Sequence, residues 1–368
     1  MNVIETFGHG GNLLTASERF GVSPEDFLDY SANINPLGMP KSVKRMLVAS
    51  IADVTQYPDP GHRVFRAALA TRLGLPKEWL LPANGAAEAM ALAILGLQPQ
   101  TVGVVYPCFS EYAQLATQFG AKVVSCYGVE ENGYKPEMVE VYRLFEAADL
   151  VFVGSPNNPT GILYQPDELV KMADWAEQTK TWLVVDEAFL DFVEEERQYT
   201  LADQLESFPH VILMRSMTKM YAIPGLRLGY AIAHPDVICR MREKQVSWSV
   251  NALALRAGEL CLQEQEYETK TRELIAGERT FLTSFIREEL GWKVWAGEAN
   301  FLLVRSPKEK TAEQLQELLG KKGILIRSCA MYPGLTAHDV RLAVRGREEN
   351  EQLVSALLDI WCGGRWER

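Results

Sequence analysis

Short apolar runs alternate with longer amphipathic segments through the middle of the chain. The runs are rich in Val, Ile and Leu and contain few polar residues, which is typical of strands covered on both faces. The expected strands are residues 102–106, 122–127, 150–154, 182–186, 211–215 and 228–233. The expected helices beside them are residues 88–97, 111–119, 167–179 and 235–244. This order predicts an α/β domain with a mostly parallel central sheet.

The pattern changes after residue 250. One long helical stretch, residues 251–290, is followed by a shorter alternation of strands and helices, which predicts a smaller α+β C-terminal domain. Its expected strands are 300–304, 325–327 and 340–344, and its expected helices are 312–321 and 348–361. Residues 1–40, rich in Gly, Asn and Pro, are expected to form an arm over the site. We therefore expect three parts: an arm (1–40), a large domain (41–248), and a linking helix with the small domain (249–368).

Composition narrows the class of protein. The 368 residues, 47% of them hydrophobic and 23% charged, suit a folded chain of this size. The net charge of −11 argues against general binding to nucleic acid or to a membrane surface. The six cysteines form no CxxC pair and the five histidines no HExxH motif, so we expect reduced thiols and no metal site. No signal peptide or membrane span is evident, which favours a cytoplasmic protein.

The first candidate for chemistry is Lys219, in the segment Arg215-Ser-Met-Thr-Lys219. A lysine that acts as a nucleophile must be fixed and partly desolvated, so that its amine is neutral. The hydroxyls of Ser216 and Thr218 and the guanidinium of Arg227 would suit a phosphate dianion nearby. A solvated lysine beside a turn bounded by glycine is the alternative interpretation of this segment.

Two further polar residues follow apolar strands. Asp186 ends the strand 182–186 and could keep a pyridine ring nitrogen protonated. Asn158, in Ser155-Pro-Asn-Asn158-Pro-Thr-Gly161, could donate a hydrogen bond to a phenolate oxygen. Taken alone, the position of Asp186 favours an ordinary cap at the end of a strand, and the Asn-Pro turn is common in loops.

The helix that begins near residue 86 offers a candidate anion site. Gly85, Ala86 and Ala87 stand at its start, where free N–H groups and the helix dipole bind phosphate. A buried alanine-rich helix is the alternative. Phe109 and Tyr112 follow the strand 102–106, so one of them could stack on a flat ring, although both could belong to the core. The sequence does not tell which aromatic stacks.

Asn158, Asp186, Lys219 and Arg227 lie at or between the carboxyl ends of consecutive expected strands, where open α/β sheets bind ligands. With the helix start and the aromatic residue before them, their order and spacing resemble the fold-type I enzymes that use pyridoxal 5'-phosphate (PLP), the aspartate aminotransferase superfamily. The resemblance covers nearly the whole chain. It implies a PLP-dependent transferase fold, with Lys219 carrying the cofactor as a Schiff base.

Two families within this superfamily are similar to the chain. His9-Gly-Gly-Asn12, residues 31–38, residues 248–252 and residues 326–335 resemble the threonine-phosphate decarboxylases of cobalamin biosynthesis. The segment 57–60 (Tyr-Pro-Asp-Pro) and a pair of arginines are shared with histidinol-phosphate aminotransferases. One departure is Phe189, where many relatives have a tyrosine that adds a hydrogen bond to the cofactor.

The resemblance also implies roles for residues outside the group expected to hold the cofactor. Arg341 is expected to hold the substrate carboxylate, and Arg327, His9 and Gly10 its phosphate. Asn33 is expected to lie against the substrate. A sixth residue, Tyr57, would reach the cofactor phosphate of the partner subunit, which implies a homodimer with shared active sites.

The resemblance thus implies decarboxylation of a small phosphorylated amino acid, L-threonine O-3-phosphate, to (R)-1-aminopropan-2-yl phosphate. The alternative is an aminotransferase that acts on histidinol phosphate or a similar phosphorylated amine. The outcome depends on which Cα bond lies perpendicular to the cofactor ring, and the sequence does not reveal that angle. A regulator with an aminotransferase-like domain would need a DNA-binding module. Because the arm begins almost at Met1, we expect an enzyme instead.

Overall fold

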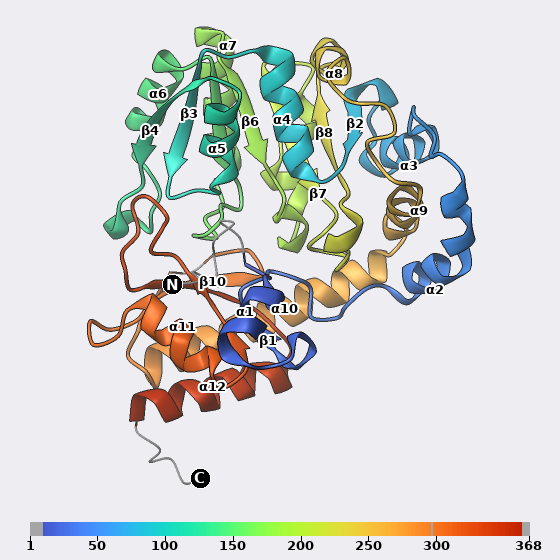
Figure 1. Cartoon of the computed structure of the whole chain (residues 1–368). Coiled ribbons are helices and arrows are strands. Elements are labelled where there is room, and N and C mark those ends of the chain that lie inside the picture. Colours follow the sequence, from blue (N-terminus) through green and yellow to red (C-terminus); the bar gives the residue numbers. More distant parts are fainter. Residues whose placement is uncertain (1–9, 296, 363–368) are drawn as a thin grey trace.

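A seven-stranded sheet forms the centre of the upper part of the molecule in Figure 1. The computed structural model describes residues 10–295 and 297–362. Strands β3 to β7 are parallel, and β8 runs antiparallel to both of its neighbours. The sheet order is β2 (Leu80–Ala83), β8 (Gly229–Ala233), β7 (Val211–Ser216), β6 (Trp182–Asp186), β5 (Leu150–Gly154), β3 (Thr101–Tyr106) and β4 (Lys122–Tyr127).

Helices cover both faces of this sheet. Along β6, Val184 packs with α4 (Ala86–Leu97), α5 (Glu111–Gln118) and α8 (Pro235–Arg242). Its neighbours Leu183 and Val185 pack on the opposite face with α6 (Met138–Ala147) and α7 (Pro166–Thr179). The expected coverage of both strand faces is confirmed for these central strands. It is wrong for β4, which forms the edge of the sheet and leaves most of its side chains partly or fully exposed.

The smaller domain lies below the large one in Figure 1. Its antiparallel sheet has the order β12 (Arg327–Ser328), β13 (Asp339–Ala343), β10 (Phe301–Arg305) and β9 (Lys293–Trp295), with helices α11 (Ala312–Gly320) and α12 (Arg347–Cys362). The helical stretch expected over 251–290 is two helices, α9 (Ala252–Cys261) and α10 (Gln265–Glu288). The first packs on α2 (Lys41–Ser50) and α3 (Arg63–Leu73) of the large domain.

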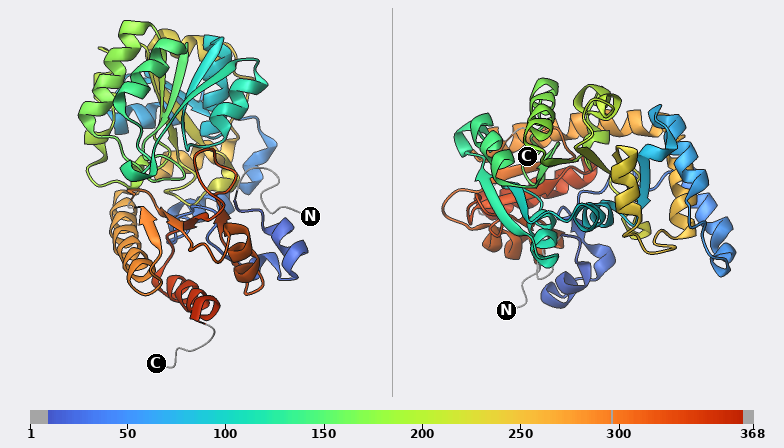
Figure 2. Two further views of the ribbon diagram at one scale, coloured as in Figure 1. Left: turned by 90° about the vertical axis from the view of Figure 1, so that its left-hand side faces the viewer. Right: turned by 90° about the horizontal axis from the view of Figure 1, so that it is seen from above.

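The N-terminal segment packs on the small domain before it crosses to the large one (Figure 2). Strand β1 (Leu28–Asp29) pairs in parallel with β11 (Ile324–Leu325). Helix α1 (Leu13–Phe20) lies against α11, where a Cβ on Gly320 would sit 2.3 Å from the Phe20 ring. Residues 29–35 consequently pass between the two domains. Among the described helices, none has the length and apolar character required to span a membrane.

Candidate active site

A cavity of about 580 Å³ lies where the two domains and the N-terminal segment meet. One wall is the carboxyl edge of the parallel strands, where open α/β sheets bind ligands. The other walls come from residues 10–34 and from strands β12 and β13. The cavity brings together most of the expected site residues: Gly10, Asn33, Ala86, Ala87, Phe109, Asn158, Asp186, Ser216, Thr218, Lys219, Arg227, Arg327 and Arg341.

Lys219 lines this cavity shortly after β7 ends. Its carbonyl oxygen accepts a hydrogen bond from the Asn35 N–H (3.3 Å), which ties the residue to the N-terminal segment. Burial, together with the nearby cations Arg341 and Arg227, lowers the pKa of Lys219 to about 8, while Asp186 opposes the shift. About one tenth of the amine is therefore neutral at pH 7, far more than for an ordinary lysine, which suits a nucleophilic role.

Asp186 lies at the end of β6 and is only 7% exposed. Its Oδ2 accepts a hydrogen bond from the Tyr112 hydroxyl (2.6 Å), and its Oδ1 accepts one from the Ala188 N–H (3.1 Å). Burial raises the pKa of Asp186, and these two hydrogen bonds oppose that rise. The hydrogen bond from the Ala188 N–H is a cap at the end of the strand, which was the alternative interpretation of Asp186 from the sequence. The carboxyl group also borders the cavity, where a cap alone would have no need to be.

The start of helix α4 lies beside the end of β7. The pairing of β7 with β8 and of β8 with β2 brings Ser216 to this helix start. The Ser216 and Thr218 hydroxyls are hydrogen bonded to each other (2.8 Å). Gly85, with φ of 83°, leaves room for Arg227, because a Cβ there would lie 2.6 Å from Arg227 Nη2. Hydroxyls, a guanidinium and the first N–H groups of α4 thus converge, which suits a phosphate.

The two candidate stacking aromatics occupy different places. Phe109 lines the cavity. Tyr112 is only 1% exposed and stacks on Phe152, with ring centroids 4.9 Å apart and an interplanar angle of 7°. Tyr112 therefore belongs to the wall behind Asp186, and Phe109 is the one of the two that borders the space for a ring.

Arg327 and Arg341 face each other across the β12–β13 pair, where their Cα atoms are register partners. They are 1% and 6% exposed, and burying two cations is costly unless other groups compensate the charge. Arg341 donates to Asn158 Oδ1 (2.7 Å) and to the Ser31 carbonyl (2.6 Å), which are both neutral acceptors. Its Nε has no hydrogen-bond partner within the described structure. Burial is the main cause that lowers the pKa of Arg341, and Arg327 adds to it.

The contact between Arg341 and Asn158 also orients the Asn158 amide. Because the amide oxygen accepts from the guanidinium, the NH2 group remains as the donor on the other side. A donor is what the expected hydrogen bond to a cofactor oxygen requires. Nearby, the Asn33 Oδ1 is buried and accepts no hydrogen bond from the described residues, although it borders the cavity. Asn33 Oδ1 and the Arg341 Nε are thus buried polar atoms without a partner in the described structure, and both residues line the cavity.

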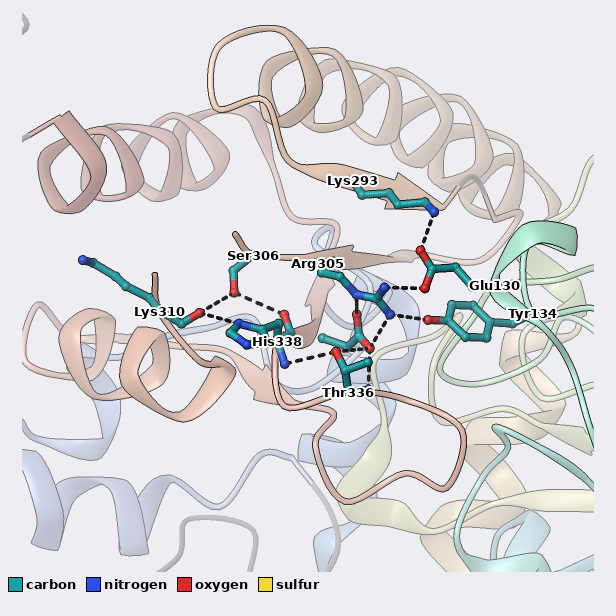
Figure 3. Close-up of polar contacts among 9 residues, drawn as sticks. Glu130, Tyr134, Lys293, Arg305, Ser306, Lys310, Thr336 and His338 are labelled. Carbon is teal, nitrogen blue, oxygen red and sulfur yellow. Dashed lines mark hydrogen bonds and ion pairs between the residues drawn. The ribbon is translucent and has the colours of Figure 1, made fainter. Parts of the chain in front are cut away.

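Strands β12 and β13 carry Arg327 and Arg341 and together form the arginine hairpin. A polar network anchors this hairpin to the large domain (Figure 3). Asp339, which is fully buried, begins β13 and forms two bonds with Arg305 of β10 (2.7 and 2.9 Å). Arg305 also contacts Glu130 and the Tyr134 hydroxyl (2.5 Å), both in the large-domain segment after β4. The Asp339 carboxylate accepts from the Thr336 N–H (2.6 Å) and hydroxyl (2.9 Å), which closes the loop between β12 and β13.

Of the expected site residues that the structure describes, Gly85 and Tyr57 do not line this cavity, and Gly85 instead leaves room for Arg227. Tyr57 is 83% exposed, packs on the Trp248 ring (centroids 4.9 Å apart) and does not border the cavity. His9 lies outside the described residues. Sequence reasoning also missed the turn at Asp29 and Ser31, which closes one wall through a short side-chain hydrogen bond (2.6 Å). Its Asp-x-Ser pattern signals a turn but not the location of that turn.

The sheet of the large domain, the antiparallel sheet of the small domain and the cavity between them define a fold-type I PLP enzyme. The chain belongs to the aminotransferase class I and II family, whose model matches residues 25–357. It is 39% identical over 356 residues to the threonine-phosphate decarboxylase of Salmonella typhimurium, which covers 96% of this chain and 97% of that protein.

Solved structures agree with the assignment. The histidinol-phosphate aminotransferase from Clostridium acetobutylicum matches with a TM-score of 0.85 and 29% identity, covering 91% of this chain and 99% of that one. The L-threonine-O-3-phosphate decarboxylase from Porphyromonas gingivalis shares the fold, with a TM-score of 0.80 and 24% identity, and covers 90% of this chain and 98% of that one. The expected fold class is confirmed, and so is PLP as the cofactor of the family.

Proposed function

We propose that the chain is a PLP-dependent decarboxylase of L-threonine O-3-phosphate in cobalamin biosynthesis, with (R)-1-aminopropan-2-yl phosphate as its product. The observation that carries this proposal is the buried pair Arg327 and Arg341, which lines the same cavity as Lys219 and Asp186. Two guanidinium groups can each form paired hydrogen bonds with an anion. A substrate with both a carboxylate and a phosphate would bind to both guanidinium groups.

The large-domain wall of the cavity fits PLP. Its phosphate would be held by Ser216, Thr218, Arg227 and the start of α4, and its ring would lie beside Phe109. Lys219 would supply a partly neutral amine to the cofactor, and Asp186 would supply a buried carboxylate. When bound, PLP supplies a ring that accepts the electron pair released from the substrate's Cα.

The small-domain wall would bind and orient the substrate. Arg341 would take the carboxylate, and Arg327 and Gly10 the phosphate, while Asn33 would lie against the substrate. In the proposed reaction the bond between Cα and the carboxylate breaks, CO2 leaves, and one proton replaces it at Cα. With a pKa of about 8, Lys219 can carry that proton on its Nζ near neutral pH.

An aminotransferase acting on histidinol phosphate is the second candidate. The 29% identity with the structure from Clostridium acetobutylicum over 91% of this chain supports it, whereas the identity with the Salmonella decarboxylase is 39% over 96% of this chain. Both reactions would use the same lysine. Histidinol phosphate itself carries a phosphate but no carboxylate, so only threonine phosphate would occupy both guanidinium groups at once. The two reactions differ in whether the carboxylate or the hydrogen leaves Cα.

The test is to supply the PLP-loaded protein with threonine phosphate and no amino acceptor, and to measure CO2. We expect continuous CO2 release with one equivalent of aminopropanol phosphate. A second assay supplies histidinol phosphate and 2-oxoglutarate, and measures glutamate. Turnover in the second assay without CO2 in the first would replace the decarboxylase by the aminotransferase.

We further propose that the enzyme is a cytoplasmic homodimer in which Tyr57 reaches the cofactor phosphate of the partner subunit. Tyr57 lies outside the cavity of its own chain and packs on the exposed Trp248, and several exposed apolar side chains lie near these two residues in the sequence. These are Val48, Ile51, Val54, Val64 and Val246. Sedimentation should give twice the chain mass, and Tyr57→Phe should weaken PLP binding. A fully active monomer would overturn the dimer.

A further inference from the structure

Tyr112 is held rigidly behind the cavity. Its ring stacks on Phe152 and meets the edge of Phe109, with centroids 5.7 Å apart at 80°. Its hydroxyl donates to Asp186 Oδ2 at 2.6 Å. Gly154 leaves space for this hydroxyl, because a Cβ there would lie 3.2 Å from it. Tyr112 does not border the cavity, so its hydroxyl can influence a bound group only through Asp186.

Once a pyridine nitrogen lies beside Asp186, the two groups share one proton, which has two possible positions. The proton can lie on the ring, giving a pyridinium and carboxylate pair, or on the carboxyl, leaving both groups neutral. A buried environment favours the neutral pair, because each charge must be desolvated. A hydrogen bond donated to the carboxylate favours the charged pair. Tyr112 supplies such a bond from a donor that packing fixes in place.

We propose that Tyr112 is a positioning residue that keeps Asp186 ionised, and so keeps the proton on the ring nitrogen of bound PLP. The inference rests on the proposed use of PLP but not on the choice of substrate. The other groups that act on Asp186 are the Ala188 N–H, which donates to Oδ1, and the cation of Lys219. Neither donates to Oδ2 in this structure, so Tyr112 has a separate role. Burial and the adjacent Asp186 raise the pKa of Tyr112, which therefore stays a donor.

The test is Tyr112→Phe in the PLP-loaded enzyme, reconstituted with PLP labelled with ¹⁵N at the ring. We expect the ¹⁵N signal to move from the pyridinium position toward that of neutral pyridine, without any substrate present. The kcat should fall about 10- to 100-fold, the range for losing one hydrogen bond to a charged group. The KM for the substrate should not change, because Tyr112 does not border the cavity.

Phe152→Leu is the matched control. It removes the stacking partner of Tyr112 from the same core cluster but keeps the hydroxyl. Both variants should lose thermal stability, yet only Tyr112→Phe should move the ring signal. If the signal stays at the pyridinium position in Tyr112→Phe and kcat is unchanged, the hydroxyl only packs and the inference is wrong. A wild-type protein that binds no PLP would instead overturn the proposed function.

Discussion

The two walls of the cavity are built in different ways. On the large-domain wall, Asp186 and Lys219 lie at or just beyond the carboxyl ends of neighbouring parallel strands, and α4 begins beside them. Strand register alone brings these groups together. On the small-domain wall, residues 10–34 and the arginine hairpin come from opposite ends of the chain. They are joined by a β1–β11 pair and by the Arg341 bond to Ser31, while the network around Arg305 ties the hairpin to the large domain.

The difference separates two kinds of function. Groups fixed by a continuous sheet move little, which suits a cofactor that stays bound through every turnover. Groups held by a few side-chain bonds between two domains can shift at smaller cost, which suits a substrate that enters and leaves. Substitutions on the large-domain wall should therefore affect kcat or the cofactor, and substitutions on the small-domain wall should affect KM.

The largest effect is expected for Lys219→Ala. Without this amine no covalent link to PLP can form at this position, and turnover should be undetectable. In the wild type, borohydride reduction and mass spectrometry should place a pyridoxyl group on Lys219. The control is Lys180→Ala, which alters a lysine at the end of α7 and outside the cavity. An adduct on any other lysine would refute the assignment of the nucleophile.

The next largest effect is expected for Asp186→Ala. The loss of one preorganised charge at an active site typically costs on the order of 100- to 1,000-fold in kcat. PLP should still bind, because the phosphate cradle at Ser216, Thr218 and Arg227 is untouched. Absorbance of the bound cofactor measures occupancy, and initial rates measure kcat. Near-normal turnover would mean that Asp186 only caps β6.

The residues of the large-domain wall could be predicted from the sequence better than those of the small-domain wall. The expected strands of the large domain agree with the structure to within one or two residues. The motifs that follow these strands place Asn158, Asp186 and Lys219 at the sheet edge, where all three line the cavity. β2 was missed, since Leu80–Ala83 is short and includes a proline. The long helix was not divided, because residues 262–264 include neither Gly nor Pro.

On the small-domain wall, nothing local marks Arg327 as a ligand rather than a surface residue. Arg327 is almost fully buried opposite Arg341 because the two strands form a hairpin, and Asp339 closes the loop of that hairpin. The contact that underlies the proposed role of Tyr112 was not predicted either. Its contact with Asp186 joins α5 to β6, and sequence spacing carries no information about that distance.

The third effect is on the phosphate of the substrate. Arg327→Ala should raise the KM for threonine phosphate about 10- to 100-fold, because a hydrogen bond to a charged group contributes roughly 1.5–3 kcal/mol. Arg327→Lys should recover only part of the loss, since an ammonium lacks the paired donors of a guanidinium. PLP content should not change.

Unphosphorylated threonine provides the control for Arg327. It should be a poor substrate of the wild type and should respond little to Arg327→Ala, since it has no phosphate to bind. Steady-state kinetics with both substrates make the comparison. If Arg327→Ala handles threonine phosphate as well as the wild type does, Arg327 does not bind the phosphate.

The fourth effect is a pH dependence set by Lys219. Its pKa is lowered from the usual lysine value to about 8, so the amine is mostly neutral above pH 8 and mostly protonated below it. Only the neutral amine attacks PLP. The rate at which apoprotein takes up PLP should therefore fall about tenfold per unit below pH 8 and level off above it. Absorbance-monitored reconstitution measures this rate, and a midpoint near the usual lysine pKa would contradict the role of burial.

The smallest effect is expected for Glu130→Gln, which tests whether the network around Arg305 positions the hairpin. Glu130 pairs with Arg305 and with Lys293 (2.5 Å), and it is the large-domain carboxylate of the network (Figure 3). It is partly exposed, and such ion pairs contribute roughly 0–1 kcal/mol, so a fall of only a few-fold is expected in kcat/KM. The fall should appear as a higher KM for threonine phosphate with kcat unchanged, because the hairpin carries the arginines that are proposed to bind the substrate and none of the residues proposed to hold the cofactor. Glu140→Gln removes another surface ion pair, with Arg143 of the same helix α6, and should leave both constants unchanged. A change in kcat or in PLP content with Glu130→Gln would mean that the network supports the cofactor wall as well, and the division between the two walls would fail.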